Sequence, residues 1–134
     1  MRIFSKIKVE IAKKLLTTPI KIPLFGPFKY FEKKMATQFE HLAPLVSVAK
    51  LNNKYFTTYS FKKNNSKKKK ALVVHGWMSK SIYMVKIIDQ LLQNNYDVIA
   101  VDLPGHGRSP GFSLNWSDSV DIILDLQKNT VHLI

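Results

Sequence analysis

The sequence contains no cysteine and no long apolar run. Without cysteine, disulfides and thiolate metal sites are excluded, and the composition fits a reducing compartment. No stretch approaches the ~20 apolar residues that a transmembrane helix needs. The N-terminus does not resemble a secretory signal, because lysines at positions 6, 8, 13 and 14 interrupt every apolar segment. We therefore expect a cytoplasmic protein, either free or peripheral to a membrane.

Acidic residues are scarce in the first half of the chain. Residues 1–70 contain seventeen Lys and Arg against three Glu, a net charge of +14, whereas residues 71–134 contain four against six Asp, a net charge of −2. This imbalance is typical of a surface that meets lipid headgroups, nucleic acid or acidic partners, but a solvated basic face produces the same composition. The lysine run at residues 62–70 has no interleaved aromatics, which argues against a specific nucleic-acid partner.

Residues 1–44 are expected to form a basic helical extension. Ile3, Ile7, Ile11 and Leu15 recur at four-residue spacing, which predicts an amphipathic helix over residues 1–18. Such a helix either lies in a membrane interface or packs on its own protein. Residues 19–28, with three prolines and a glycine, predict an irregular connector, and a second helix is expected at about 29–42.

Residues 45–134 have the pattern of an α/β domain. Strand-type segments at 46–51 and 54–61 flank Asn52-Asn53, which predicts a β-hairpin. An apolar strand is expected at 71–74, then a helix that Ser79 or Ser81 caps and that ends near Gln93, then a strand at 97–101. The expected fold is a hairpin followed by βαβαβ, in a mostly parallel sheet.

The last expected units are a helix at about 116–127, which Ser113 or Asn115 starts and Asn129 ends, and a buried strand at 130–134. Four positions should line the sheet-facing side of this helix: Val120, Ile123, Leu124 and Gln127. The strand at 130–134 should form an exposed apolar edge that promotes self-association.

Two polar motifs follow the parallel strands. His75-Gly76-Trp77 follows the first, and the eight residues 102–109, DLPGHGRS, follow the second. In parallel sheets, chemistry gathers at these carboxyl ends. The glycine spacing does not fit the dinucleotide fingerprint, and no phosphate-loop motif is present. The histidines at 41, 75, 106 and 132 have no metal-ligand spacing, so we expect neither a metal nor another cofactor.

Together, the two motifs resemble those of the α/β-hydrolase superfamily, in particular its serine esterase and lysophospholipase-like members. The resemblance covers residues 45–134, the N-terminal half of such a domain. It implies that the backbone N–H of Trp77 is an oxyanion donor, with that of Met78 as a second candidate. Gly76 would let substrate approach the backbone, and the His75 imidazole would orient the loop.

The second motif is expected to be architectural. Proline and glycines allow a tight turn, while polar side chains hydrogen-bond to the loop backbone. The resemblance implies that the triad acid and histidine come later in the chain. The supporting residues expected in this loop are Asp102, Pro104, Gly105, His106, Gly107 and Ser109.

The nucleophile elbow is expected at the turn after residues 130–134, so the resemblance implies a domain truncated before it and a chain inactive alone. The complete protein would cleave a small ester or lipid-like substrate by a Ser-His-acid mechanism. An Asp nucleophile, as in dehalogenases and epoxide hydrolases, stays open, although the absence of proline after Trp77 favours serine. Two alternatives are a non-catalytic basic module that binds membranes or polyanions, and a non-functional product of a truncated gene.

Overall fold

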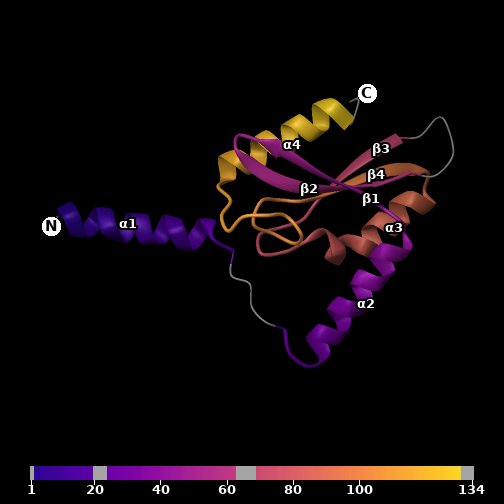
Figure 1. The fold of residues 1–134 in the computed structure, drawn as a ribbon, viewed down its shortest axis with the longest axis horizontal. Coiled ribbons are helices and arrows are strands. Elements are labelled where there is room, and N and C mark those ends of the chain that lie inside the picture. Colours follow the sequence, from indigo (N-terminus) through magenta and orange to yellow (C-terminus); the bar gives the residue numbers. More distant parts are fainter. Residues whose placement is uncertain (1, 20–23, 63–68, 131–134) are drawn as a thin grey trace.

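The computed structural model describes residues 2–19, 24–62 and 69–130 (Figure 1). Two helices, α1 (Arg2–Thr17) and α2 (Pro27–His41), precede the strands β1 (Leu45–Leu51), β2 (Lys54–Phe61) and β3 (Lys69–Val74). A short 3₁₀ helix, η1 (Ser81–Met84), leads into α3 (Val85–Gln93), and β4 (Tyr96–Asp102) and α4 (Trp116–Thr130) follow.

The four strands form one mixed sheet in the order β1-β2-β4-β3. Asn52 and Asn53 have φ angles of 48° and 60°, so the predicted hairpin turn forms where both residues can adopt positive φ. β2 also pairs antiparallel with β4, whereas β3 and β4 are parallel because η1 and α3 cross over between them. The predicted α/β class is therefore confirmed. The described sheet is mixed and not mostly parallel, because two of its three strand pairings are antiparallel.

Helices cover both faces of the sheet. Figure 1 shows α4 on one side and α2 with α3 on the other. On the α2–α3 side, Phe39 packs edge-to-face against Tyr59 and Phe61, with ring centroids 4.9 and 5.3 Å apart. On the α4 side, the buried core residues are Phe56, Val101, Leu103, Leu114, Ile122 and Leu126. The carboxyl ends of β3 and β4 lie between these layers.

The predicted first helix is present as α1, which projects from the body in Figure 1. Its C-terminal end is attached where the Leu114 N–H donates to the Thr17 carbonyl at 2.8 Å. The apolar side chains of Ile11 and Leu15 are exposed, so this part of the stripe packs on no other element of the described structure. No helix within the described ranges is long and apolar enough to cross a membrane.

The prediction for α4 was wrong in two respects. Val120 and Leu124 are exposed, and the helix packs through Ser119, Ile122 and Leu126 instead. The helix carries apolar residues on more than one face, so periodicity alone did not identify the packed one. The helix also continues past Asn129 to residue 130, so no strand starts there. Residues 131–134 lie outside the described ranges, and edge-driven self-association stays a prediction.

The starts of the helices also differ from the prediction. Neither Ser79 nor Ser81 caps a helix through its side chain. Instead, the Ser81 backbone N–H donates to Asp102 Oδ1 at 2.7 Å, so a carboxylate from β4 takes the role of a cap. Asn115 does cap α4, because its Oδ1 accepts from the Asp118 N–H at 2.7 Å. Within the lysine run at 62–70, residues 69 and 70 belong to β3, and residues 63–68 are outside the described ranges.

Candidate active site

Two buried histidines join the loops that follow β3 and β4. His75, after β3, accepts at Nε2 from the Leu103 N–H at 3.1 Å. His106, after β4, accepts at Nε2 from the Met78 N–H at 3.2 Å. Each ring therefore receives a backbone donor from the other loop, and the rings lie 5.1 Å apart between centroids. This reciprocal pairing fixes the two loops against each other.

Both rings must carry their proton on Nδ1. The Nδ1 of His75 lies 2.8 Å from the Gly76 carbonyl, and the Nδ1 of His106 lies 3.0 Å from the Pro104 carbonyl. A carbonyl only accepts, so Nδ1 donates and Nε2 is left as an acceptor. Burial lowers the pKa of His75 below its ordinary value, which favours this neutral form. The geometry assigns both histidines to positioning.

Asp102, at the end of β4, accepts hydrogen bonds from three parts of the fold. Oδ2 accepts from the Tyr59 hydroxyl at 2.7 Å and from the Arg108 N–H at 2.9 Å, while Oδ1 accepts from the Ser81 N–H. These donors come from β2, from the loop itself and from η1. The carboxylate is fully buried, so its donors replace the water that it loses. Burial and the bond to Asp102 raise the pKa of Tyr59, which keeps its hydroxyl a donor.

The loop contains a sequence, Gly107-Arg108-Ser109-Pro110-Gly111, that fits the G-x-S-x-G pattern of a nucleophile elbow. Its geometry does not fit that role. Ser109 is only 4% exposed, its Oγ donates to the Asp102 carbonyl, and the same Oγ accepts from the Thr57 N–H at 2.8 Å. Over the described ranges, no serine hydroxyl bonds a histidine ring. Ser109 is therefore a structural residue that ties the loop to β2.

The two candidate oxyanion donors differ in their surroundings. The Met78 N–H is already paired with His106 Nε2, and Met78 has a positive φ of 57°. The Trp77 N–H has no hydrogen-bond acceptor among the residues that the structure describes. Gly76, which precedes it, has open space where a Cβ would lie. Of the two candidates, Trp77 is thus the one whose N–H remains available to a ligand among the described residues.

A largely apolar cavity of about 270 Å³ adjoins this donor. Trp77 and Trp116, which both line it, stack with ring centroids 6.1 Å apart, and His106 meets the edge of Trp77 at 5.2 Å. Val120 and Ile123, on the exposed face of α4, complete the wall. The sequence contains two tryptophans, Trp77 and Trp116, and both line this cavity.

A larger cavity of about 680 Å³ lies on the other side of the loops, beneath the first half of α2. Its lining includes Met78 and Gly107 at the strand ends. Across it, Lys80 pairs with Glu32 of α2 at 2.5 Å, and the Tyr83 hydroxyl donates to the same carboxylate at 2.7 Å. Burial raises the pKa of Glu32, but these two hydrogen bonds and the Lys80 charge outweigh it, so the net pKa is lowered.

Residues 65–134 match the model of the family described as serine aminopeptidase, S33. This match covers 70 of the 134 residues, more than half of the chain. The chain belongs to the S33 family. Both motifs lie within the matched segment. A search of curated proteins found no match.

Solved structures show which fold this S33 member shares. The esterase Pf2001 of Pyrococcus furiosus superposes with a TM-score of 0.54 at 20% identity, over 85% of this chain and 41% of the esterase. A monoglyceride lipase of Saccharomyces cerevisiae gives 0.53 at 20% identity, over 65% of this chain and 30% of the lipase. An epoxide hydrolase of Aspergillus niger gives 0.53 at 13% identity, over 75% and 31%. The described elements therefore match the N-terminal part of the α/β-hydrolase fold, and the chain spans less than half of each structure.

Sequence patterns missed two residues of the site. Tyr59 lies in the middle of β2, where its position suggested only a core residue, and nothing local indicates that its hydroxyl reaches Asp102. Trp116 marked the start of a helix, and only the folded chain brings it against Trp77. Within the described ranges, no group of three His, Asp or Glu side chains could hold a metal ion.

Proposed function

We propose that this S33 chain supplies the oxyanion-binding loop of a hydrolase that acts on ester or related acyl bonds. The observation that carries the proposal is the Trp77 N–H at the carboxyl end of β3, which has no acceptor in the described part of the chain and lies beside an apolar cavity. Acyl transfer develops negative charge on the former carbonyl oxygen, and a preorganised backbone donor stabilises that charge. Removal of one such donor from an oxyanion hole costs ~3 kcal/mol of transition-state stabilisation.

The surroundings of Trp77 favour this role over that of an ordinary turn. The reciprocal bonds of His75 and His106 hold the two loops together, so the donor does not have to be reoriented when substrate binds. The Asp102 carboxylate fixes the second loop beneath it. Preorganisation of this kind is where electrostatic catalysis gains most of its effect.

The proposal extends to the nucleophile of the hydrolase. We favour a Ser-His-acid mechanism, with an Asp nucleophile as the alternative. We assign neither the nucleophile nor the catalytic histidine or acid to a described residue. Ser109 is unsuited, because its hydroxyl is buried and bonded to the backbone on both sides. In the absence of those groups the described residues would bind an acyl group without cleaving it.

The cavity sets a limit on the acyl group. At ~30 Å³ for each water-sized group, its 270 Å³ corresponds to about nine non-hydrogen atoms. The lining is mostly apolar, with Trp77, Trp116 and Ile123 among its walls. A short aliphatic acyl chain fits this volume and chemistry.

Intrinsic fluorescence tests this part of the proposal, because both tryptophans line the cavity. Titration with hexanoate should change the emission of the chain in a saturable way, and Ile123→Glu should abolish the change by placing a charge in the cavity. Leu124→Glu, on the same helix but not part of the lining, is the matched control and should titrate like the unmodified chain. No response to hexanoate, or an equal loss in both variants, would overturn the assignment of this cavity.

The projection of α1 favours a second candidate function, peripheral membrane contact through residues 1–18. Residues 1–18 carry five Lys and Arg against one Glu, and Ile11, Leu15 and Leu16 are exposed. A basic helix with an exposed apolar side suits an anionic bilayer surface. Ile11→Ser with Leu15→Ser should weaken binding to phosphatidylglycerol vesicles. Unchanged binding would contradict membrane contact through α1.

A further inference from the structure

A cluster of exposed aromatic side chains lies at the N-terminal end of α2, outside both sites described above. Phe25, Phe28, Tyr30 and Phe31 are each between 56% and 74% exposed. Four aromatics within seven residues contrast with 11% over the whole sequence. Exposed apolar residues scattered singly need no explanation, but a cluster of this kind marks an interaction surface. We refer to these four residues as the aromatic tip.

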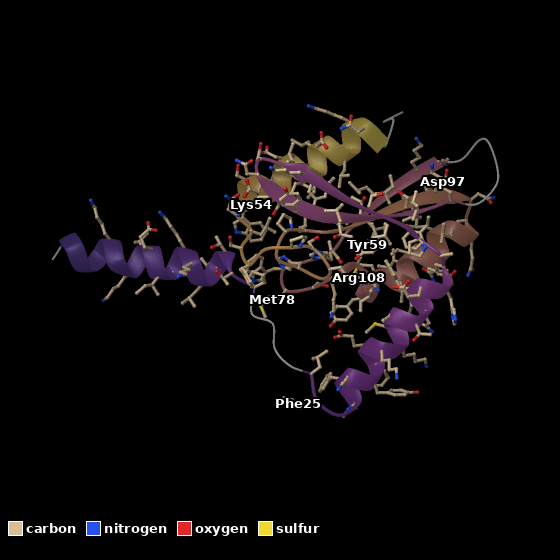
Figure 2. All side chains as sticks on the ribbon, in the orientation of Figure 1. Phe25, Lys54, Tyr59, Met78, Asp97 and Arg108 are labelled. Atoms are coloured by element: carbon tan, nitrogen blue, oxygen red, sulfur yellow. The ribbon has the colours of Figure 1, made fainter. Side chains whose placement is uncertain are left out.

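The aromatic tip continues the buried stripe of α2 beyond the protein body. Phe39 is fully buried, and Met35, four residues earlier, packs against the same core. Phe28 lies seven residues before Met35, so helical spacing places it on the same side, ~16 Å along the axis from Phe39. Figure 2 shows Phe25 at the end of α2 that points away from the sheet. The stripe therefore extends past the part of the sheet that could cover it.

The side chains of the aromatic tip suit a boundary between apolar and aqueous phases. Tyr30 and Phe31 meet edge-to-face with centroids 5.8 Å apart, so two of the four rings are in contact. Tyrosine presents an apolar ring and a polar hydroxyl, and such residues are enriched where lipid tails give way to headgroups.

The charge around the aromatic tip has one sign. Lys29, Lys33 and Lys34 are exposed on the same turns of α2. Glu32, the acidic residue among them, is neutralised by the ammonium of Lys80. The free charge beside the aromatics is therefore positive, which complements an anionic bilayer surface.

We propose that the aromatic tip inserts into the headgroup region of an anionic lipid bilayer, with the neighbouring lysines on the lipid phosphates. A second copy of the chain fits this surface less well, because a symmetric contact would bring the lysines of two molecules together. The tip lies on the bilayer surface and not across it, in keeping with the absence of a spanning helix in the described ranges.

The location of the tip adds a consequence that rests on the proposed function. Lys29 and Lys33 also line the 680 Å³ cavity, whose far wall includes Met78 and Gly107 at the ends of β3 and β4. Insertion of the tip would hold this opening at the bilayer surface. A substrate with an acyl chain would then reach the strand ends from the lipid phase.

Vesicle sedimentation tests the proposal on the full chain, with vesicles of equal parts phosphatidylcholine and phosphatidylglycerol and with phosphatidylcholine alone. Phe28→Ser with Phe31→Ser should weaken binding to the anionic vesicles roughly tenfold or more, because each substitution removes apolar area from the contact. The matched control is Phe112→Ser with Ile87→Ser, two exposed apolar residues on other elements, which should bind within about twofold of the unmodified chain.

Three further measurements keep the result interpretable. Circular dichroism should show the same fold in both double variants, and hexanoate titration should be unchanged, which separates this inference from the proposed function. The tip substitutions should also weaken binding when Ile11→Ser and Leu15→Ser already disable α1. Equal binding of the tip and control variants would overturn the inference, as would a dimer in solution that the tip substitutions convert to a monomer.

Discussion

Replacing Gly107 with alanine should be among the most destabilising single changes in this chain. Gly107 has a φ of +49°, and a Cβ added there would lie 2.2 Å from Asp102 Oδ2 and 2.3 Å from its Cγ. Ordinary contact begins at 3.4 Å, so the carboxylate must move by about 1.2 Å. It cannot do so without leaving the donors of Tyr59, Ser81 and Arg108, which now lie at 2.7, 2.7 and 2.9 Å.

The magnitude follows from these contacts. A hydrogen bond to a buried charged group contributes ~1.5–3 kcal/mol, so the loss of two of the three costs ~3–6 kcal/mol. The left-handed backbone of a non-glycine residue adds ~1–2 kcal/mol. The sum, ~4–8 kcal/mol, is a large share of the ~5–15 kcal/mol by which domains are stable. At a urea dependence of ~2 kcal/mol per molar, the unfolding midpoint should fall by ~2–4 M.

Urea denaturation followed by circular dichroism measures this effect, and two other glycines serve as internal controls. Gly76→Ala should change the free energy of unfolding by less than ~0.5 kcal/mol, because a Cβ there meets nothing within 4 Å and φ is not positive. Gly105→Ala should be intermediate, with a φ of +74° and a Cβ 3.2 Å from the Ser113 nitrogen. If Gly107→Ala is no more destabilising than Gly76→Ala, the role assigned to Asp102 is refuted.

Three further predictions concern the same loops. Because folding lowers the pKa of His75, the unfolded chain binds more protons than the folded chain near and below pH 6.5. The free energy of unfolding should therefore be highest above pH 6.5 and decline as the pH falls below it. In urea titrations, His75→Gln should flatten this pH dependence, and an unchanged dependence would contradict the prediction. Tyr59→Phe should lower the free energy of unfolding by ~1.5–3 kcal/mol, because the hydrogen bond to Asp102 is lost. Tyr55→Phe, at an exposed position on the same strand, should lower it little. Equal losses would argue against the bond between Tyr59 and Asp102. A fluorophosphonate probe should leave Ser109 unmodified by mass spectrometry, whereas labelling there would show that the hydroxyl is accessible.

The sequence predicted those parts of the fold in which residue types determine backbone geometry. Asn52-Asn53 between two strand patterns predicted the hairpin because these residues tolerate positive φ. The motif around His75 and the one that begins at Asp102 follow parallel neighbouring strands, so their meeting at one edge of the sheet was predictable. Local chemistry was sufficient for this much.

The remaining features depend on contacts between distant segments. The sequence of α4 offers two apolar sides, one with Ile122 and one with Val120, and only the position of the sheet decides which of them packs. The bond from Tyr59 to Asp102 spans 43 positions, and the aromatic stack joins Trp77 to Trp116 from separate elements. Pairings of this kind leave no periodic trace in a sequence, since they depend on tertiary geometry.

The measurement that tests the central claim most directly is the amide NMR signal of Trp77 during titration with butyrate, whose carboxylate stands in for the oxyanion. A backbone donor that receives the anion should show the largest shift of its ¹⁵N–¹H peak among the assigned amides, and the shift should saturate. The Met78 amide, which already donates to His106, should move much less. A Trp77 signal that stays in place while butyrate binds, or a larger shift at Met78, would contradict the assignment of Trp77 as the oxyanion donor.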